Sequence, residues 1–303
     1  MPPTLLVLLG PTAVGKTALS LQLAEKLSAP IVSADSRQMF RGMEIGTAAP
    51  TTEEQARVRH YFVGTLAPDQ YYNAAHYEQE ALALLDKLFE HHKTVILTGG
   101  SMLYLDAICQ GIDHIPTVDE EVRHTLKKRL ETEGLDRLRA ELRLVDAEYY
   151  DSCDQRNARR IVHALEIYYT CGQPYSSFRT GRQTKRPFRI IKVGLHRERA
   201  DLFDRINRRA AMMMERGLID EARRLSPFRH CNALNTVGYK EAFRFIDGEW
   251  TLEQVLEKIS RNTRVYAKKQ MTWFQKDNAI NWFDAKTVSP ENDILPQITT
   301  IAI

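Results

Sequence analysis

The sequence has few cysteines: there are four in 303 residues, and no two of them form a C-x-x-C pair. Cys109, Cys153, Cys171 and Cys231 lie far apart, which argues against a zinc site or a disulfide framework and fits a reducing cytoplasm. No apolar run approaches the roughly 20 residues that span a bilayer, so we expect no membrane contact. The opening stretch MPPTLLVLLG lacks a basic region, so we do not expect a signal peptide.

Charge of one sign is not in large excess either, because the net charge is +3. Hydrophobic residues make up 43% and charged residues 27%, which is typical of a globular protein. The basic residues are nevertheless concentrated in the second half of the chain. They form three clusters: Arg156, Arg159 and Arg160; Arg179, Arg182, Lys185, Arg186 and Arg189; and Arg261, Arg264, Lys268, Lys269 and Lys276. Any one cluster fits an ordinary solvated face, but together they favour a polyanion larger than a nucleotide.

The stretch LLGPTAVGKTALS matches the phosphate-binding pattern G-x-x-x-x-G-K-[ST]. An apolar strand pattern precedes it and a helical pattern follows, which is the context that the motif requires. Backbone N–H groups in such a loop turn toward an anion, and the helix N-terminus adds positive potential. The expected phosphate-binding residues are Gly10, Pro11, Thr12, Ala13, Val14, Gly15, Lys16 and Thr17. Lys16 would reach the outer phosphates and the Thr17 hydroxyl would ligate Mg2+. P-loops usually hold ATP or GTP, but the loop itself recognises only phosphates.

Alternating strand and helix patterns in the first third predict an α/β fold, a P-loop NTPase-like parallel sheet core with an inserted helical domain. The expected strands are TLLVLLG, APIVSADS, KTVILTGG and FRIIKVGLH, with HYFVGT as a further candidate. Only helical patterns appear between about residues 118 and 170. We therefore predict a core formed by residues 1–111 and 188–303, and a helical insertion at 112–187.

Asp35 follows the second expected strand, at the edge of the sheet where the P-loop also lies. A carboxylate there could accept a proton from a substrate or bind Mg2+, and read alone it fits a turn aspartate equally well. No strand ends in an acidic Walker B pattern, which counts against a motor ATPase. Arg205 and Arg209 stand four apart on one expected helix face. They could clamp a diphosphate from the side opposite the loop, or pair with Asp201 or Asp204 at the surface.

Several blocks together resemble the tRNA dimethylallyltransferase family of isopentenyl-tRNA transferases, in the family's order and over nearly the whole chain. These blocks are GPTAVGKTALSLQLA, ADSRQMFRGMEIGTAAP, LTGGSMLYLDAI, QRNARRIVHALEI, NTVGYKEAF and TRVYAKKQMTWF. The P-loop alone is weak evidence, whereas D-S-R-Q, G-T-A, the glycine turn and the terminal block together are highly specific. The absence of a cysteine pattern for a zinc finger makes the resemblance closest to the bacterial type.

The resemblance implies that the P-loop holds the diphosphate of dimethylallyl diphosphate, and that the enzyme transfers the prenyl group to N6 of adenine 37 in tRNA, releasing diphosphate. Lys16, Thr17 with Mg2+, and Arg209 would stabilise the leaving group, while Asp35 would accept the proton from N6. The partners are then the tRNA anticodon stem-loop and dimethylallyl diphosphate, in the cytoplasm, with no membrane, no obligate protein partner and a monomeric enzyme.

By the same resemblance, further residues would contact tRNA. These are Asp35, Ser36, Arg37, Gln38, Ser101, Arg123, Gln155, Arg156, Asn157, Ala158, Arg159, Asn235, Thr236, Val237, Gly238, Tyr239 and Lys240. Three positions depart from the family pattern: Ser101 replaces a threonine, Ala49 replaces a lysine, and His60 stands alone where two histidines are common. None of these removes a proposed catalytic group.

Three alternatives differ in the substrate. A small-molecule or nucleotide kinase shares the P-loop core, but does not need the basic helical insertion and the basic, aromatic terminal helix. A non-catalytic RNA-binding module would not need the intact Lys16, Thr17 and Asp35. A relative that prenylates free AMP remains open, although the long insertion favours tRNA.

Overall fold

A computed structural model of the chain describes residues 2–181 and 184–299. The chain divides into two compact units. The core unit consists of Met1–Cys109 and Arg186–Ile303, and the helical unit of Gln110–Lys185. In the sequence, the helical unit thus lies between the two parts of the core unit.

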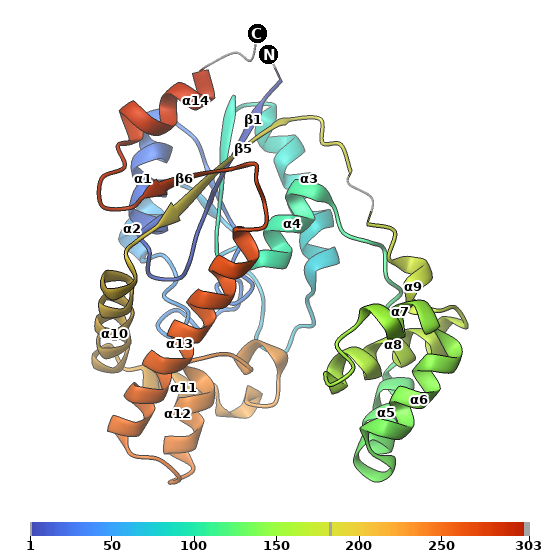
Figure 1. The fold of residues 1–303 in the computed structure, drawn as a ribbon. Coiled ribbons are helices and arrows are strands. Elements are labelled where there is room, and N and C mark those ends of the chain that lie inside the picture. The colour runs from blue at the N-terminus through green and yellow to red at the C-terminus, as the bar shows by residue number, and fades with distance from the viewer. Residues whose placement is uncertain (1, 182–183, 300–303) are drawn as a thin grey trace. The chain divides into compact units, whose positions relative to one another are not determined.

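A parallel sheet runs through the core unit in the strand order β3-β2-β4-β1-β5-β6 (Figure 1). Its strands are β1 (Thr4–Leu9), β2 (Ile31–Ser33), β3 (His60–Tyr61), β4 (Thr94–Thr98), β5 (Arg189–His196) and β6 (Ile280–Asp284). Leu6 of β1 lies opposite Ile96 and Ile191 on the two neighbouring strands. The predicted α/β class is confirmed, although β6 was not predicted because only its first residue is buried.

Helices cover both faces of the sheet. The helices of the core unit are α1 (Lys16–Leu27), α2 (Thr52–Arg57), α3 (Ala74–Phe89), α4 (Met102–Gln110), α10 (Arg199–Glu215), α11 (Leu218–Arg224), α12 (Tyr239–Ile246), α13 (Leu252–Phe274) and α14 (Leu295–Thr299). Short turns are η1 (Ser226–Phe228), η2 (Asn232–Leu234) and the π-helical η3 (Pro290–Ile294). No helix in the described ranges is long and apolar enough to cross a bilayer.

Successive side chains of β1 point to opposite faces of the sheet, and they divide the core into two layers. Leu5, Val7 and Leu9 join a cluster that includes residues of α3, α4, α12 and α13. Leu6 and Leu8 point the other way, into a cluster built largely from α1 and the start of α10. Figure 1 shows α1 on one side of the sheet and α3 and α4 on the other. Because all six residues of β1 are buried, the loop that follows it starts from a fixed position.

The helical unit has its own small core. Its helices are α5 (Glu120–Glu133), α6 (Leu135–Val145), α7 (Ala147–Ser152), α8 (Ala158–Cys171) and α9 (Tyr175–Phe178). Leu126, Leu138, Leu142, Ile161 and Leu165 are almost completely buried at its centre. Asp119 and Asn157 cap α5 and α8 through their side chains, which explains where these helices begin.

Two arginines of the predicted basic loop stabilise the core unit instead of forming a free cationic surface. The Arg186 side chain is 7% exposed, pairs with Glu78 and donates to the carbonyls of Ala107 and Ile108. Arg189 donates to the backbone carbonyls of Gln297 and Ile298 in α14. The expectation that this basic cluster faces a polyanion was therefore wrong for these two residues, because each of them has a buried or backbone acceptor. Arg182 lies outside the described residues.

Candidate active site

The P-loop leaves β1 through a glycine that no other residue could replace without strain. Gly10 has a φ of +144°, and a Cβ there would lie 2.6 Å from the backbone oxygen of Leu195. Gly15, with a φ of +121°, precedes the first residue of α1. Ala13 between them is also left-handed, with a φ of +66°. These residues with positive φ turn N–H groups of the loop toward its inside.

Most amide groups of the loop are available to an anion. The N–H of Val14 bonds to Pro11, and that of Thr12 bonds to a side chain of α13. The part of the chain that the structure describes offers no acceptor to the amides of Ala13, Gly15, Lys16 and Thr17. No side chain caps the start of α1. The loop and the helix start therefore form a site for a phosphate-like group.

Lys16 is held inside the loop. Its Nζ donates to the carbonyls of Gly10 and Pro11, each at 2.9 Å. Burial, together with the positive charge of Arg209, lowers the pKa of Lys16 to about 7, against the raising effect of Asp35. An anion bound at the loop would favour the charged ammonium form, since an opposite charge nearby stabilises it.

Three arginines on the chain after β5 donate hydrogen bonds to the loop. Arg197 donates to the carbonyl of Val14 at 2.7 Å, and Arg205 to that of Ala13 at 2.8 Å. Arg205 therefore binds the loop rather than pairing with Asp201 or Asp204. Arg209 donates to the Thr12 hydroxyl, and burial lowers the pKa of its guanidinium. The three contacts fix the loop conformation and bring positive charge to it.

Asp35 closes a tight turn just after β2. Its Oδ1 accepts from the amides of Arg37 at 2.9 Å and Gln38 at 3.3 Å. None of the described residues donates to Oδ2. One oxygen thus has the turn role that the sequence allowed, while the second stays available to a substrate. The negative charge of Asp35 opposes the lowering of the pKa that burial causes at Lys16 and Arg209.

The glycine turn after β4 lies directly against this aspartate turn. A Cβ on Gly99 would lie 2.2 Å from the backbone oxygen of Ala34, so only glycine permits the contact. The Ser101 hydroxyl accepts from the amide of Ser36 at 2.8 Å and donates to its hydroxyl at 3.1 Å. Ser101 therefore holds the residue next to Asp35. This contact requires a hydroxyl, which the replacement of threonine by serine preserves.

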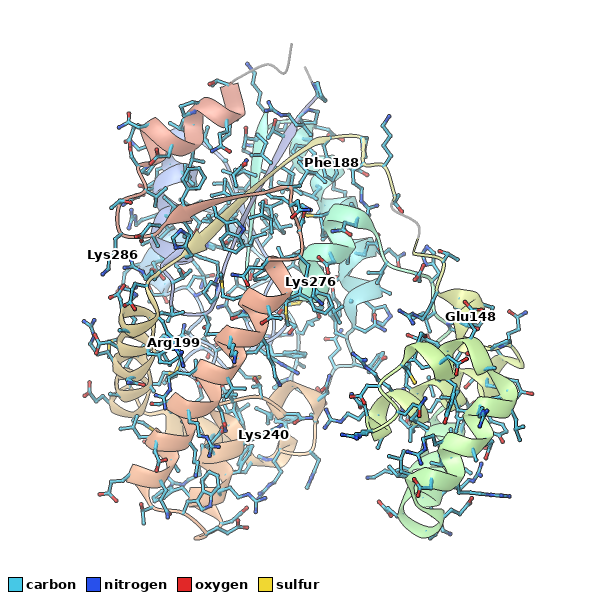
Figure 2. The ribbon with its side chains drawn as sticks, viewed as in Figure 1. Glu148, Phe188, Arg199, Lys240, Lys276 and Lys286 are labelled. Carbon is cyan, nitrogen blue, oxygen red and sulfur yellow. The ribbon has the colours of Figure 1, made fainter. Side chains whose placement is uncertain are left out.

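A cavity of about 590 Å³ joins these parts within the core unit. Its lining includes Thr12 and Arg209 from the phosphate side, and Asp35 and Ser101 from the turns. Besides Thr12, the predicted residues in this lining are Asp35, Ser36, Arg37, Ser101, Arg209, Asn235, Thr236, Val237, Gly238 and Lys240. Lys240, labelled in Figure 2, marks the start of α12 on this wall. A cavity of this size with convergent polar groups is typical of a ligand site.

Two residues that were predicted to contact tRNA make hydrogen bonds within the core unit. Gln38 uses its amide to hold the backbone carbonyls of Thr47 and Ala48. Tyr239 has no exposed surface, and its hydroxyl donates to the buried carboxylate of Glu221 at 2.6 Å. Both therefore shape the cavity wall through internal hydrogen bonds.

The remaining predicted residues lie in the helical unit. Arg123, on α5, approaches Glu166 to 3.8 Å. The segment 155–159 forms the turn before α8 and its start, where Asn157 is the cap. Arg156 and Arg159 are exposed. These residues are available to a partner on the surface of their own unit.

Sequence reasoning missed the residues that tie the site together. Gln270, on α13, accepts from the amide of Thr12 and donates to the carbonyl of Gly100, both at 2.8 Å. Tyr266, one turn earlier, donates to the same carbonyl at 3.2 Å. The i, i+4 spacing of these two polar side chains on an amphipathic helix was the available signal. Arg197 was missed because nothing near it in the sequence reveals its partner.

Comparisons with known proteins agree with this geometry. A family model described as IPP transferase matches residues 38–277. The tRNA dimethylallyltransferase 1 of Phocaeicola vulgatus is 60% identical over 93% of this chain and 94% of its own length. The protein of the same name from Bacteroides thetaiotaomicron is 58% identical, over 93% of this chain and 91% of its own.

Solved structures show the same relationship. The full-length tRNA isopentenylpyrophosphate transferase of Bacillus halodurans has a TM-score of 0.67 at 36% identity, covering 93% of this chain and 90% of that chain. A eukaryotic dimethylallyltransferase acting on tRNA has a TM-score of 0.79 at 23% identity, over 93% of this chain and 74% of that chain, and so shares the fold. On the extent of these matches, the chain belongs to the IPP transferase family.

Proposed function

We propose that this protein transfers a dimethylallyl group from dimethylallyl diphosphate to N6 of adenine 37 in tRNA and releases diphosphate. The observation that carries the proposal is that Thr12 and Arg209 of the phosphate site line the same cavity as Asp35. The site that would bind the anionic leaving group and the carboxylate that would accept the proton thus line the same cavity. The names of the relatives supply the substrate class.

Ionisation of an allylic diphosphate places negative charge on the bridging oxygen and on the diphosphate. The free amides of Ala13, Gly15, Lys16 and Thr17 provide donors for that charge, and Lys16 and Arg209 provide two cations. Because the backbone donors are fixed before the reaction, they stabilise the developing charge without reorganising.

The adenine amino group is a weak nucleophile and must lose a proton as the new carbon–nitrogen bond forms. Oδ2 of Asp35 is the acceptor, while Oδ1 holds the turn and so fixes the direction of the carboxylate. Proton transfer to a positioned side chain contributes about 10²- to 10⁴-fold to a rate.

Thr17 fits the expected Mg2+ site. Its side chain is exposed in the first turn of α1, beside the free amides. The described residues contain no cluster of three acidic, histidine or cysteine side chains that could enclose a metal. Mg2+ would therefore be held by the Thr17 hydroxyl and by diphosphate oxygens, as is usual for this ion. Bound there, it would neutralise charge on the leaving group.

The base must leave the anticodon stack to reach Asp35, since the carboxylate lies in a cavity. Ser36, Arg37 and the 235–240 segment line that cavity and would contact the extruded base and its neighbours. Arg123 and the 155–159 segment of the helical unit would contact the RNA backbone. We expect the enzyme to act as a monomer in the cytoplasm, where a tRNA substrate is found.

The proposal is tested with a dimethylallyl diphosphate labelled in the prenyl group, Mg2+ and an anticodon stem-loop carrying adenines at 36 and 37. Stem-loops with guanine at 37, AMP and ATP are offered in parallel. We expect label only in the RNA with adenine 37, and an N6-alkylated nucleoside after digestion.

Each other outcome points to a different enzyme. Label on AMP alone would replace tRNA by a free nucleotide as the acceptor. Phosphate release from ATP without prenyl transfer would mean that the P-loop holds a nucleotide and that the kinase alternative is correct.

A further inference from the structure

Gln270 connects two loops that come from opposite parts of the site. Its Oε1 accepts from the amide of Thr12 in the P-loop, and its Nε2 donates to the carbonyl of Gly100 in the glycine turn. The side chain is 1% exposed, so neither contact exchanges readily with water. Thr12 and Gly100 have no direct hydrogen bond to each other among the described residues.

The two ends of this bridge lead directly to the two reacting groups. On one side, the Thr12 hydroxyl accepts from Arg209, which belongs to the diphosphate site. On the other side, Gly100 precedes Ser101, which holds the amide of Ser36 next to Asp35. A continuous chain of bonded groups thus runs from the diphosphate site through Gln270 to the Asp35 turn.

The chemistry of the bridge is specific to a neutral amide. One atom must accept from an N–H and its neighbour must donate to a C=O, which glutamine does and an ionised glutamate cannot. A Cβ on Gly100 would lie 2.4 Å from Nε2 of Gln270, so glycine is needed for this close approach. Tyr266 donates to the same carbonyl and lines the cavity.

We propose that Gln270 is a positioning residue that sets the separation between the diphosphate site and the Asp35 turn, and hence between the allylic carbon and the attacking amino group. The proposal rests on the proposed function for its chemistry. In-line attack needs the two substrates within a few tenths of an ångström of contact distance, and a 1 Å misplacement can cost about 100-fold in rate. Gln270 touches neither substrate and acts through the two loops.

The test compares Gln270→Leu, which removes both hydrogen bonds at similar volume, with Gln275→Leu, an identical substitution at an exposed position just after the same helix. For each protein we would measure kcat, KM for both substrates, calorimetric binding of inorganic diphosphate, and Tm. We expect Q270L to bind diphosphate and stem-loop RNA within about threefold of the wild type while kcat falls about 100-fold. Q275L should match the wild type throughout.

Gln270→Glu gives a second, reversible variant. Burial raises the pKa of a carboxyl group, and a protonated carboxyl can both accept from Thr12 and donate to Gly100. The ratio of the kcat of Q270E to that of the wild type should therefore rise as the pH falls from about 8 to about 6. A merely space-filling role would leave this ratio constant.

Hydrogen exchange tests the bridge without the chemical step. In the wild type, inorganic diphosphate should slow exchange in the P-loop and also in segments 35–38 and 99–101. In folded Q270L it should slow exchange in the P-loop alone. Protection that reaches both segments in Q270L, or a kcat within threefold of the wild type, would overturn the positioning role. Failure of the wild type to prenylate RNA would contradict the proposed function. The hydrogen-exchange result would still decide whether Gln270 links the two loops.

Discussion

Nη2 of Arg209 lies 2.5 Å from Oγ1 of Thr12, although the two residues are 197 positions apart in the sequence. The contact brings a guanidinium from α10 to the mouth of the P-loop. Because the amide of the same threonine is bound by Gln270, Thr12 is held on both sides. The positive charge of Arg209 is thereby fixed where a diphosphate would leave.

Arg209→Gln should lower kcat by about 10²- to 10³-fold, since it removes the charge that stabilises the leaving group. Steady-state transfer to an anticodon stem-loop measures this. Arg208→Gln is the control, because Arg208 is the neighbouring residue, is 66% exposed and pairs with Asp204. Equal activity of the two variants would show that Arg209 has no part in stabilising the leaving group.

Lys16 should make diphosphate binding depend on pH. Its pKa of about 7 in the free protein means that the side chain loses its proton as the pH rises through neutrality. A bound anion favours the ammonium, so above this pH binding must take up a proton. The affinity advantage of the wild type over Lys16→Met should be complete below pH 7 and then shrink by up to about tenfold per pH unit.

Calorimetry at pH 8 in two buffers of different ionisation enthalpy measures that proton uptake directly. The wild type should take up more protons than Lys16→Met on binding inorganic diphosphate. Identical uptake would show that Lys16 keeps its proton in the free protein.

Asp35→Asn should separate the two roles of this residue. The asparagine Oδ1 can still accept from Arg37 and Gln38, so the turn and the Tm should be retained. The lost proton acceptor should lower kcat by about 10²- to 10⁴-fold. Asp35→Ala should lose both activity and part of the stability. Full activity of Asp35→Asn in a stem-loop assay would assign the proton to another group.

The exposed arginines of the helical unit should contribute to RNA affinity through phosphates. Replacing both Arg156 and Arg159 by alanine should make the negative slope of log affinity against log salt shallower by about 1.5, since each phosphate contact contributes about 0.7 to 0.9 to its magnitude. Filter binding of the stem-loop between low and moderate salt measures the slope. Arg223→Ala, at an exposed arginine that pairs with Asp220, should leave the slope unchanged. An unchanged slope in the double variant would place the RNA elsewhere.

The strongest sequence patterns predicted the centre of the fold. β1 and β4 are almost wholly buried and half of β5 is, so they appear in the sequence as apolar runs. The P-loop is recognisable because its glycines are required by backbone geometry. β3 has only two residues, and β6 carries mostly half-buried polar and aromatic ones, so neither has a clear pattern. Whether a short edge strand forms depends on the strands and helices that it packs against more than on its own residue types.

The sequence predicted those site residues that directly follow a strand or belong to a motif. It did not predict contacts between residues that are far apart in the sequence. Asp35 and Ser101 directly follow strands, so their place at the edge of the sheet could be inferred. The bond between Thr12 and Gln270 spans 258 positions, and no spacing rule links them. The expectation that Arg186 belongs to a basic surface was wrong for a related reason, since its acceptors at Glu78 and in α4 become apparent only in the fold.

Arg186 also has a consequence for how the two units could change independently. The chain leaves the core unit after Cys109 and returns at Arg186, and the guanidinium of Arg186 binds the carbonyls of Ala107 and Ile108 at the point of departure. The two segments of the core unit that lead into and out of the helical unit are therefore held together by hydrogen bonds within the core unit. The helical unit is in this sense an exchangeable module, and a short linker or another helical unit grafted between these points would leave these hydrogen bonds in place.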